Sequence, residues 1–359
     1  MTKILIEGYS HITSFDLSEI CFVRLATVLP ISVRAKLSRD ISQADLAWCD
    51  ILLCIRGDNP LSAYLAKRAS AAGRKVVLLL DDDLFEYSFG REWWDKVRCE
   101  SLRSVLSVAD FMITPSAYLG EKYHRLCGID YVVSHTIVQP EEMMPERESV
   151  PGLVRIVYAA GTGHKVFFDQ LVSPVLNKLH DRYGDGIALT VIGPDVNTGD
   201  SGLACEKVPS MPMEQYRDYM KTHPFDIGLA PLLDSELGRS KYFNKYLEYS
   251  TQGICGVYSD VLPYAPIIQD GENGFLAEND PEVWYQAICR AVDNAELRKK
   301  CVETAQQRIL RDHSLERVAD SLRKGIPFFC TYSAPVVKLR HMRPMMPFFL
   351  LVESRRRFL

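Results

Sequence analysis

The sequence has 359 residues, of which 47% are hydrophobic and 25% charged, and its formal net charge is −4. These values are typical of a folded chain of about two domains and exclude a disordered or collagen-like protein. The slightly acidic balance argues against a protein that binds nucleic acid over its whole surface, so we expect no nucleic-acid partner.

No apolar run approaches the roughly 18 residues that a membrane-spanning helix needs. The first segment, MTKILIEGYSHITSFD, has one strand-length apolar run and lacks the long apolar stretch and cleavage site of a signal peptide. The ten cysteines form no CxxC pair and lie mostly in apolar runs, where a reduced cysteine packs as a small buried residue. We therefore expect a cytoplasmic protein.

The first half of the chain alternates short β-branched runs with stretches of helical periodicity. Nearly uniform apolar strands separated by helices are typical of a parallel sheet that is covered on both faces. The predicted strands are 3–8, 51–55, 75–80, 110–114 and 131–134, and the predicted helices are 16–29, 60–72, 92–108 and 116–127.

A proline-rich segment, PEEMMPERESVP at 140–151, interrupts this alternation and has the composition of a linker. The alternation then resumes, which predicts an α/β protein of two Rossmann-like, doubly wound domains that face a central cleft. We expect an N-terminal domain over 1–145 and a C-terminal domain over 151–325. The strands predicted in the second half are 154–160, 187–192, 226–229 and 254–258, and the segment 270–276 is predicted to be a turn that leads into a short strand. Helices are predicted up to residue 182, near 242–250 and after residue 281.

The last segment, 326–359, carries six basic residues and one acidic residue around the apolar run PMMPFFLLV. One interpretation is a tail that packs back on the domains and ends in a basic stretch. The other is a peripheral membrane contact through 336–359, in which apolar side chains insert and arginines meet anionic headgroups. In that case the protein would lie at the inner face of the membrane.

An acidic triplet, Asp81-Asp82-Asp83, follows the predicted strand 75–80. Three carboxylates at one strand end repel one another, so hydrogen-bond donors or a cation must offset them. One interpretation is a set of polar contacts to an acceptor, with Asp82 as a base, and another is a cap of the next segment. A third is an Asp-x-Asp pair that chelates Mn²⁺ or Mg²⁺.

Two other strand ends in the first half carry polar residues. Ser10 and His11 follow the first strand, where His11 would shuttle a proton or orient an acceptor hydroxyl, although a surface histidine fits equally well. Ser116 follows the strand 110–114 and needs no function, because a serine there caps the next helix.

The loop GTGHK at 161–165 joins the first strand and the first helix of the second half. Glycines let the backbone approach a phosphate closely, and the following helix start supplies N–H groups. Lys165 or His164 would add positive charge. The candidate contacts here are Gly161, Thr162, Gly163, His164 and, at the end of the next strand, Gly193, which an ordinary turn would explain as well.

The segment RSKYFNKYLEYSTQGICGVYSDVLPY, at 239–264, carries a polar stripe. On one helix its members would share roughly 100° of arc. Lysines neutralise a diphosphate, and a carboxylate accepts both hydrogen bonds of a vicinal diol such as a ribose. A solvated helix face with paired charges would show the same stripe. Its members are Lys241, Asn244, Lys245 and Glu248.

These residues resemble the donor-site block of nucleotide-sugar-dependent glycosyltransferases with the GT-B fold, specifically those like glycosyltransferase family 4. The resemblance rests on Lys245-Tyr-Leu-Glu248-Tyr, on GICGVYSDVLPY at 253–264 and on DGENGFL at 270–276. It covers residues 154–315 well and the N-terminal half loosely. It implies that the C-terminal domain binds the nucleotide sugar and the N-terminal domain the acceptor. It also implies that the anomeric configuration is retained and that no metal or other cofactor is required.

By the same resemblance, Glu248 takes the place of the second glutamate of the family's E-x7-E pattern, which holds the ribose hydroxyls. The first glutamate falls at Ser240, which is a departure from the pattern. Lys241 or Arg239 would take over part of its work.

We therefore predict a retaining glycosyltransferase that moves a hexosyl unit from a nucleoside-diphosphate sugar to a saccharide or lipid-linked saccharide in cell-surface polysaccharide synthesis. The predicted catalytic residues are Lys165, Lys241, Lys245, His11 and Asp82. The predicted donor contacts are Gly161, Thr162, Gly163, His164, Gly193, Asn244, Glu248 and Ser240, and the acceptor contacts are Ser10, Asp81 and Asp83.

Two alternatives remain at this point. One is a non-catalytic GT-B relative that scaffolds polysaccharide assembly, which the substitution at Ser240 suggests. The other is a metal-dependent transferase with the GT-A fold that uses Asp81 and Asp83.

Overall fold

The structure is a computed structural model that describes residues 1–88, 90–144 and 152–336. The apolar run of the predicted membrane contact, at 344–352, lies outside the described residues. Most of the predicted linker at 140–151 lies outside them as well.

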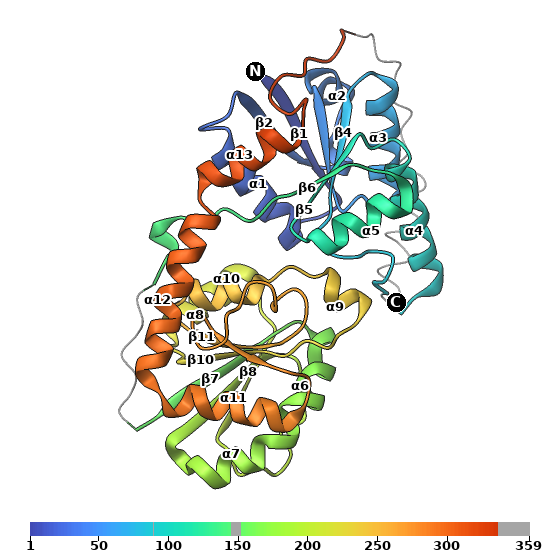
Figure 1. Cartoon of the computed structure of the whole chain (residues 1–359). Helices are drawn as coiled ribbons and strands as arrows, with labels where there is room; N and C mark the ends of the chain where they lie inside the picture. The colour runs from blue at the N-terminus through green and yellow to red at the C-terminus, as the bar shows by residue number, and fades with distance from the viewer. Residues whose placement is uncertain (89, 145–151, 337–359) are drawn as a thin grey trace. The chain divides into compact units, whose positions relative to one another are not determined.

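Within the described residues, twelve strands form two separate six-stranded sheets (Figure 1). Pairs such as β1–β2, β3–β4 and β7–β8 run parallel, which confirms the predicted α/β class with two doubly wound parallel sheets. In sheet order the first contains β2 (Ile31–Leu37), β1 (Thr2–Gly8), β3 (Ile51–Ile55), β4 (Lys75–Leu79), β5 (Phe111–Thr114) and β6 (Tyr131–Val133). The second contains β12 (Phe275–Ala277), β11 (Cys255–Ser259), β10 (Ile227–Ala230), β7 (Val154–Ala159), β8 (Ile187–Gly193) and β9 (Cys205–Pro209).

Helices separate the strands along the chain. Those before β7 are α1 (Thr13–Leu25), α2 (Gln43–Trp48), α3 (Pro60–Ala71), α4 (Glu92–Leu106) and α5 (Ala117–Cys127). Those after it are α6 (Lys165–Leu171), α7 (Leu176–Tyr183), α8 (Met213–Thr222), α9 (Glu236–Ser240), α10 (Asn244–Thr251), α11 (Pro281–Asp293), α12 (Ala295–Asp312) and α13 (Leu315–Gly325). The short 3-10 turns are Ser38–Asp40, Pro140–Glu142, Thr162–His164, Ser173–Val175 and Gly184–Gly186.

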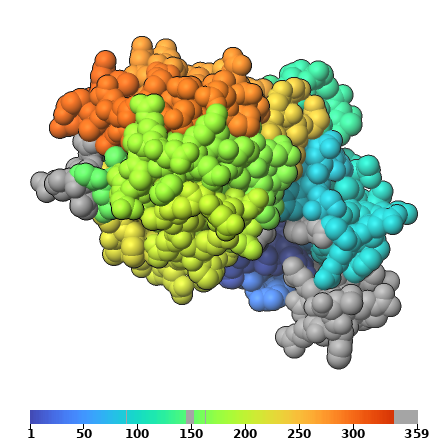
Figure 2. Space-filling model, turned by 90° about the horizontal axis from the view of Figure 1, so that it is seen from below, coloured from blue at the N-terminus to red at the C-terminus, as the bar shows by residue number. Residues whose placement is uncertain are grey.

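The second sheet is buried on both faces, and β7 shows how. Ile156 and Tyr158 belong to a core that also contains residues of α6, α7 and α11. Val157 and Ala159 alternate with them and belong to a core with residues of α8, α10 and α12. Because both faces are covered, the four residues from Ile156 to Ala159 are all apolar and buried, as a strand inside a parallel sheet should be. In Figure 2 the orange residues toward the C-terminus lie along one side of the green and yellow residues of this part of the chain.

Two strands that the sequence did not predict lie at sheet edges. β2 ends the first sheet and β9 ends the second. Each pairs on one side only, and each carries partly exposed polar side chains, such as Arg34 in β2 and Lys207 in β9. Their mixed composition follows from this position, because an edge strand is less buried than a central one.

The chain divides into two compact units. The first comprises the described residues of Met1–Leu79, Lys96–Phe111 and Pro327–Leu359. The second comprises those of Leu80–Asp95 and Met112–Ile326, and it therefore includes the acidic triplet, α5 and all elements from β7 to α13.

The cysteines and the helices test two expectations from the sequence, that the cysteines are reduced and that no helix spans a membrane. All ten cysteines are free, as predicted, and Cys49, Cys54, Cys255, Cys289 and Cys301 are buried. Among the helices of the described residues, none combines the length and apolar character needed to cross a bilayer.

Candidate functional site

The loop between β7 and α6 presents two glycines to open space. A Cβ atom added to Gly161 or Gly163 would meet no atom within 4 Å, and neither residue has a positive φ. Packing and backbone conformation therefore do not require glycine at either position. A ligand that approaches this backbone closely would require it.

At Gly193, at the end of β8, the backbone conformation and the packing do require a glycine. Its φ is +103°, and an added Cβ would lie 2.2 Å from the carbonyl oxygen of Ala160. The same loop is held to β8 by a hydrogen bond from the Ala160 N–H to the carbonyl oxygen of Ile192, at 3.1 Å. The fold itself explains this glycine.

His164 follows the two open glycines and lies near the predicted lysines. Its carbonyl oxygen accepts a hydrogen bond from the Tyr158 hydroxyl at 2.8 Å. The pKa of His164 is lowered to about 4, mainly because the ring is buried and further because Lys241 and Lys245 lie near it, while Asp82 acts in the opposite direction. At neutral pH the ring is therefore uncharged, and the positive charge beside the loop comes from the lysines.

Lys165, the other predicted cation of this loop, turns toward its own helix. It forms an ion pair with Asp169, one turn further along α6. The second oxygen of Asp169 accepts the N–H of Asn197 at 2.7 Å. Lys165 remains 45% exposed, so the pair lies at the surface beside the loop that follows β8.

Lys241 does not belong to the helix that carries Lys245, which corrects the prediction of one continuous stripe. α9 ends at Ser240, Lys241 has an extended backbone with φ −69° and ψ 160°, and α10 starts at Asn244. Tyr242 and Phe243, which lie between the two helices, are both buried in the core of the second unit.

Lys245 and Glu248 form a compact group on α10. The ammonium of Lys245 lies 2.9 and 2.8 Å from the two carboxylate oxygens of Glu248. Their side chains are only 24% and 26% exposed, so the pair is not the solvated helix face of the alternative interpretation.

Tyr216, from α8, completes this group. Its hydroxyl donates to Glu248, and its ring lies 5.5 Å below the ammonium of Lys245. Burial, followed by the charge of Glu248, raises the pKa of Tyr216, so the phenol keeps its proton. Sequence reasoning missed this residue, because nothing in the local pattern of α8 relates it to a helix 32 positions later.

Asp82 connects the acidic triplet to the lysines. Its Oδ1 lies 3.3 Å from the ammonium of Lys241, and the two side chains are 24% and 17% exposed. The predicted catalytic residues Asp82, Lys241 and Lys245 thus lie near His164 in one region of the second unit.

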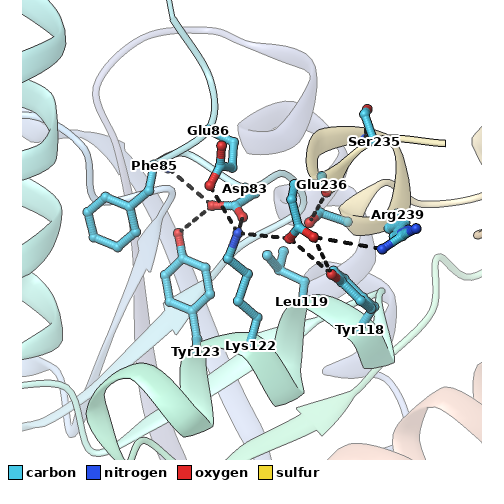
Figure 3. A network of polar contacts seen from close by, with 12 residues as sticks. Asp83, Phe85, Glu86, Tyr118, Leu119, Lys122, Tyr123, Ser235, Glu236 and Arg239 are labelled. Carbon is cyan, nitrogen blue, oxygen red and sulfur yellow. Dashed lines mark hydrogen bonds and ion pairs between the residues drawn. The ribbon is translucent and has the colours of Figure 1, made fainter. Parts of the chain in front are cut away.

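Asp83 points elsewhere, which corrects its prediction as an acceptor contact. Its side chain is fully buried, with the ammonium of Lys122 at 2.7 Å and the hydroxyl of Tyr123 at 3.2 Å. The N–H of Phe85 also donates to it, at 3.2 Å. Figure 3 shows these three partners around one carboxylate. A group enclosed in this way serves the fold and is not accessible to a substrate.

The same network joins α5 to α9 (Figure 3). Glu236 accepts hydrogen bonds from Tyr118 at 3.0 and 2.9 Å and lies 3.3 Å from the ammonium of Lys122. These bonds lower the pKa of Glu236. The contacts attach α9 to α5, the helix whose Lys122 and Tyr123 bind Asp83. They thereby also hold the segment after α9, which carries Lys241.

Ser240, at the place of the family's first glutamate, and Arg239, one of its two predicted substitutes, are both engaged at or next to α9. Ser240 is fully buried, and its hydroxyl donates to the carbonyl oxygen of Glu236 at 2.8 Å, so its side chain does not reach the surface of the site. Arg239 forms a bidentate pair with Asp234, at 2.6 and 2.8 Å. Asn244 is exposed at the start of α10.

The remaining predicted residues are placed as follows. Ser10 and His11 lie in the first unit, where Nδ1 of His11 is 2.9 Å from Asp16 and the histidine side chain is 69% exposed. Asp81 is partly buried beside Asp82. Ser116 caps α5 as predicted, because its hydroxyl accepts the N–H of Leu119 at 3.3 Å.

The acidic triplet does not have the surroundings of a metal site. Within the described part of the chain, no three His, Cys, Asp or Glu residues are grouped so that they could hold a metal ion. At Asp83 the positive charge comes from Lys122, which therefore replaces the metal that an Asp-x-Asp chelate would need.

Comparisons with known proteins show the fold. No protein-family model matches the sequence, and no curated protein matches it. The solved structure of Anabaena Alr3699/HepE in complex with UDP and glucose aligns with 91% of this chain and 100% of its own, at 12% identity and a TM-score of 0.62. Sucrose-phosphate synthase from Thermosynechococcus elongatus aligns with 90% of this chain and 98% of its own, at 11% identity and a TM-score of 0.59.

A third similar structure is the lipopolysaccharide outer core galactosyltransferase WaaB in its apo form. It aligns with 91% of this chain and 99% of its own, at 12% identity and a TM-score of 0.58. Together with the two separate parallel sheets, these likenesses establish the GT-B fold, as predicted. The alternative with the GT-A fold is wrong.

Proposed function

We propose that the chain is a retaining glycosyltransferase that moves a hexosyl unit from a nucleoside-diphosphate sugar to a saccharide or lipid-linked saccharide. One observation carries the proposal: open glycines, two lysines and a held carboxylate meet in one region of the second unit. These are Gly161 and Gly163 beside His164, with Lys241 and Lys245 near that histidine, and Glu248 fixed by Lys245 and Tyr216.

Each group has a task in this chemistry. The transfer leaves a nucleoside diphosphate, and its negative charge grows as the bond to the sugar breaks. Lys241 and Lys245 would stabilise this charge, with backbone N–H groups of the glycine loop. Glu248 would accept the hydrogen bonds of the two ribose hydroxyls. Because lysines supply the positive charge, we propose that no metal is required.

The lysines are neutralised within the chain. Lys165 pairs with Asp169, Lys241 with Asp82, and Lys245 with Glu248. A diphosphate would therefore share or displace these carboxylates, and part of its binding free energy would be spent on that exchange. We infer that the nucleotide binds with moderate affinity and that its binding rearranges the Lys241–Asp82 pair.

The structural likenesses favour a sugar-nucleotide substrate. HepE has been solved with UDP and glucose, and WaaB is described as a galactosyltransferase. At 12% identity these properties do not transfer with the fold. They do select the nucleotides to test first, and they support a role in the synthesis of a cell-surface polysaccharide.

The first experiment measures nucleotide binding by thermal shift and calorimetry with UDP, GDP, ADP and dTDP. A ligand that binds the native protein raises the unfolding midpoint, and we expect one of the four to do so. If none does, the chain is better described as the non-catalytic scaffold.

The second experiment tests Glu248 with the Glu248→Ala variant. Loss of a carboxylate that accepts two hydrogen bonds should weaken nucleotide binding about tenfold or more. Glu303→Ala, which removes an exposed glutamate on α12, is the matched control and should bind as the unchanged protein does. If Glu248→Ala folds and binds the nucleotide undiminished, the assignment of Glu248 is wrong.

The third experiment measures transfer itself. Release of nucleoside diphosphate from sugar nucleotides should depend on a saccharide acceptor, and the product should keep the anomeric configuration of the donor. We expect EDTA to leave the rate unchanged. A rate that EDTA abolishes and Mn²⁺ or Mg²⁺ restores would contradict the proposed role of the lysines.

A further inference from the structure

The second unit contains a pocket of about 930 Å³ that the proposed function does not use. Tyr246 of α10 and Phe243, just before that helix, line it, together with Arg308 from α12 and Arg317 from α13. All of its lining residues belong to the second unit. Its volume is in the range of about 300–1,000 Å³ that is usual for small-molecule sites.

The pocket is distinct from the candidate donor site, although both use α10. At about 100° per residue, Tyr246 lies about 100° around this helix from Lys245 and about 160° from Glu248, so it points away from that pair. None of the predicted donor or catalytic residues lines the pocket. A ligand could therefore occupy it while the donor site is filled.

One part of the pocket wall is aromatic and fixed in place. Phe243 and Tyr246 are 9% and 4% exposed, and the Tyr246 hydroxyl accepts a hydrogen bond from Asn273 at 2.9 Å. The rings of His135 and His313 lie 4.9 Å apart in the same wall. Burial, followed by the proximity of His313, lowers the pKa of His135 to about 4, so this ring contributes no charge at neutral pH.

The other part of the wall is charged, with an excess of positive groups. Four basic side chains line the pocket, against the carboxylates of Asp312 and Asp320. Three of them have acidic partners: Arg311 pairs with Asp312, Lys324 with Asp320, and Arg308 with Glu272. The fourth, Arg317, is exposed and has no ion-pair partner among the residues that the structure describes.

This combination specifies a class of ligand. A guanidinium presents a planar fork of donors that matches a carboxylate or a phosphate. The aromatic rings offer flat apolar surface to the C–H face of a sugar, and Gln269, Ser321 and the histidines offer hydrogen bonds to hydroxyls. We propose that the pocket binds a saccharide that carries an anionic group, either a carboxylate or a phosphate.

The test is calorimetric titration of the full chain with two pairs of probes. The carboxylate pair is a hyaluronan tetrasaccharide and the neutral chitotetraose, and the phosphate pair is glucose 6-phosphate and glucose. We expect the anionic member of at least one pair to bind about tenfold or more tightly than its neutral partner, since only the anionic member can form charge-assisted hydrogen bonds with the arginines. Which pair responds identifies the anionic group.

Variants and a competitor locate the binding. Arg317→Ala and Arg308→Ala should each weaken it about tenfold, whereas Lys300→Ala, an exposed cation elsewhere on α12, should not. Saturating UDP should leave it unchanged, which also separates this proposal from that of the donor site. The proposal is overturned if neither anionic probe binds, if inorganic phosphate binds as tightly as the better probe, if the arginine variants bind normally, or if UDP displaces the saccharide.

Discussion

Asp82 and Asp83 are neighbours in the chain, but their surroundings differ. Asp83 is fully buried and is bound by an ammonium, a phenol and a backbone N–H. Asp82 is 24% exposed and meets the ammonium of Lys241 at the longer distance of 3.3 Å. The partner of Asp83 lies on α5, among residues that stabilise the fold. The partner of Asp82 is one of the cations proposed to bind the donor.

The difference suggests separate roles for the two residues of one acidic motif, with Asp83 stabilising the fold and Asp82 acting at the proposed donor site. A buried carboxylate with matched partners is costly to disturb, because its removal leaves buried donors such as the Tyr123 hydroxyl without an acceptor. A partly exposed pair of longer distance contributes little to stability and can exchange partners. The same distinction separates Gly193, which the backbone of the loop requires, from Gly161 and Gly163, which face open space.

The largest expected effect is on stability at Asp83. Asp83→Ala should lower the free energy of unfolding by about 3 kcal/mol, because it removes the acceptor of the Tyr123 hydroxyl and the Phe85 N–H together with one carboxylate partner of Lys122. Urea denaturation measures this value. Asp82→Ala is the matched control and should cost about 1 kcal/mol or less. If the two variants lose equal free energy of unfolding, the assignment of a structural role to Asp83 but not to Asp82 is wrong.

The glycines offer a second pair of matched changes. Gly193→Ala should destabilise the protein by about 2 kcal/mol, because its positive φ disfavours a side chain and its Cβ would collide with the carbonyl of Ala160. Gly163→Ala should leave the unfolding midpoint unchanged but weaken nucleotide binding. A stable Gly163→Ala variant with undiminished nucleotide binding would remove the loop from the donor site.

The fold was largely predictable from the sequence, because buried parallel strands have an unmistakable apolar pattern. The predicted strand 51–55 coincides with β3 (Ile51–Ile55), and the strand 75–80 differs from β4 by one residue. The edge strands β2 and β9 were missed, because partial exposure replaces the apolar run with mixed residues.

The candidate site was only partly predictable. Lys245 and Glu248 were identified as neighbours because residues three positions apart lie side by side on a helix. Tyr216 and Lys122 were not, since each meets its partner across the tertiary structure. Spacing alone also placed Lys241 on the helix of Lys245, whereas the backbone is extended at Lys241 and α10 starts only at Asn244.

A smaller effect is expected when Asp82 loses its charge. In Asp82→Asn the ammonium of Lys241 no longer has a carboxylate partner, so a diphosphate need not displace one. Nucleotide affinity should rise about threefold to tenfold, which corresponds to about 1 kcal/mol. Calorimetry with the nucleotide identified by thermal shift measures the change. If Asp82 also acts on the acceptor, turnover should fall while binding strengthens, and a weaker affinity would contradict the proposed exchange.

The smallest effect is a change in the pKa of His164. In the protein without nucleotide this pKa is about 4, lowered by burial and then by Lys241 and Lys245. A bound diphosphate would offset the lysine charges, so the pKa should rise by about one unit. Binding would then take up a proton between the two pKa values, and affinity should increase as the pH falls through that range and stay constant near pH 7. NMR titration of the His164 ring protons with and without the nucleotide measures the shift. An unchanged His164 in a protein that binds the nucleotide would place the diphosphate away from this loop.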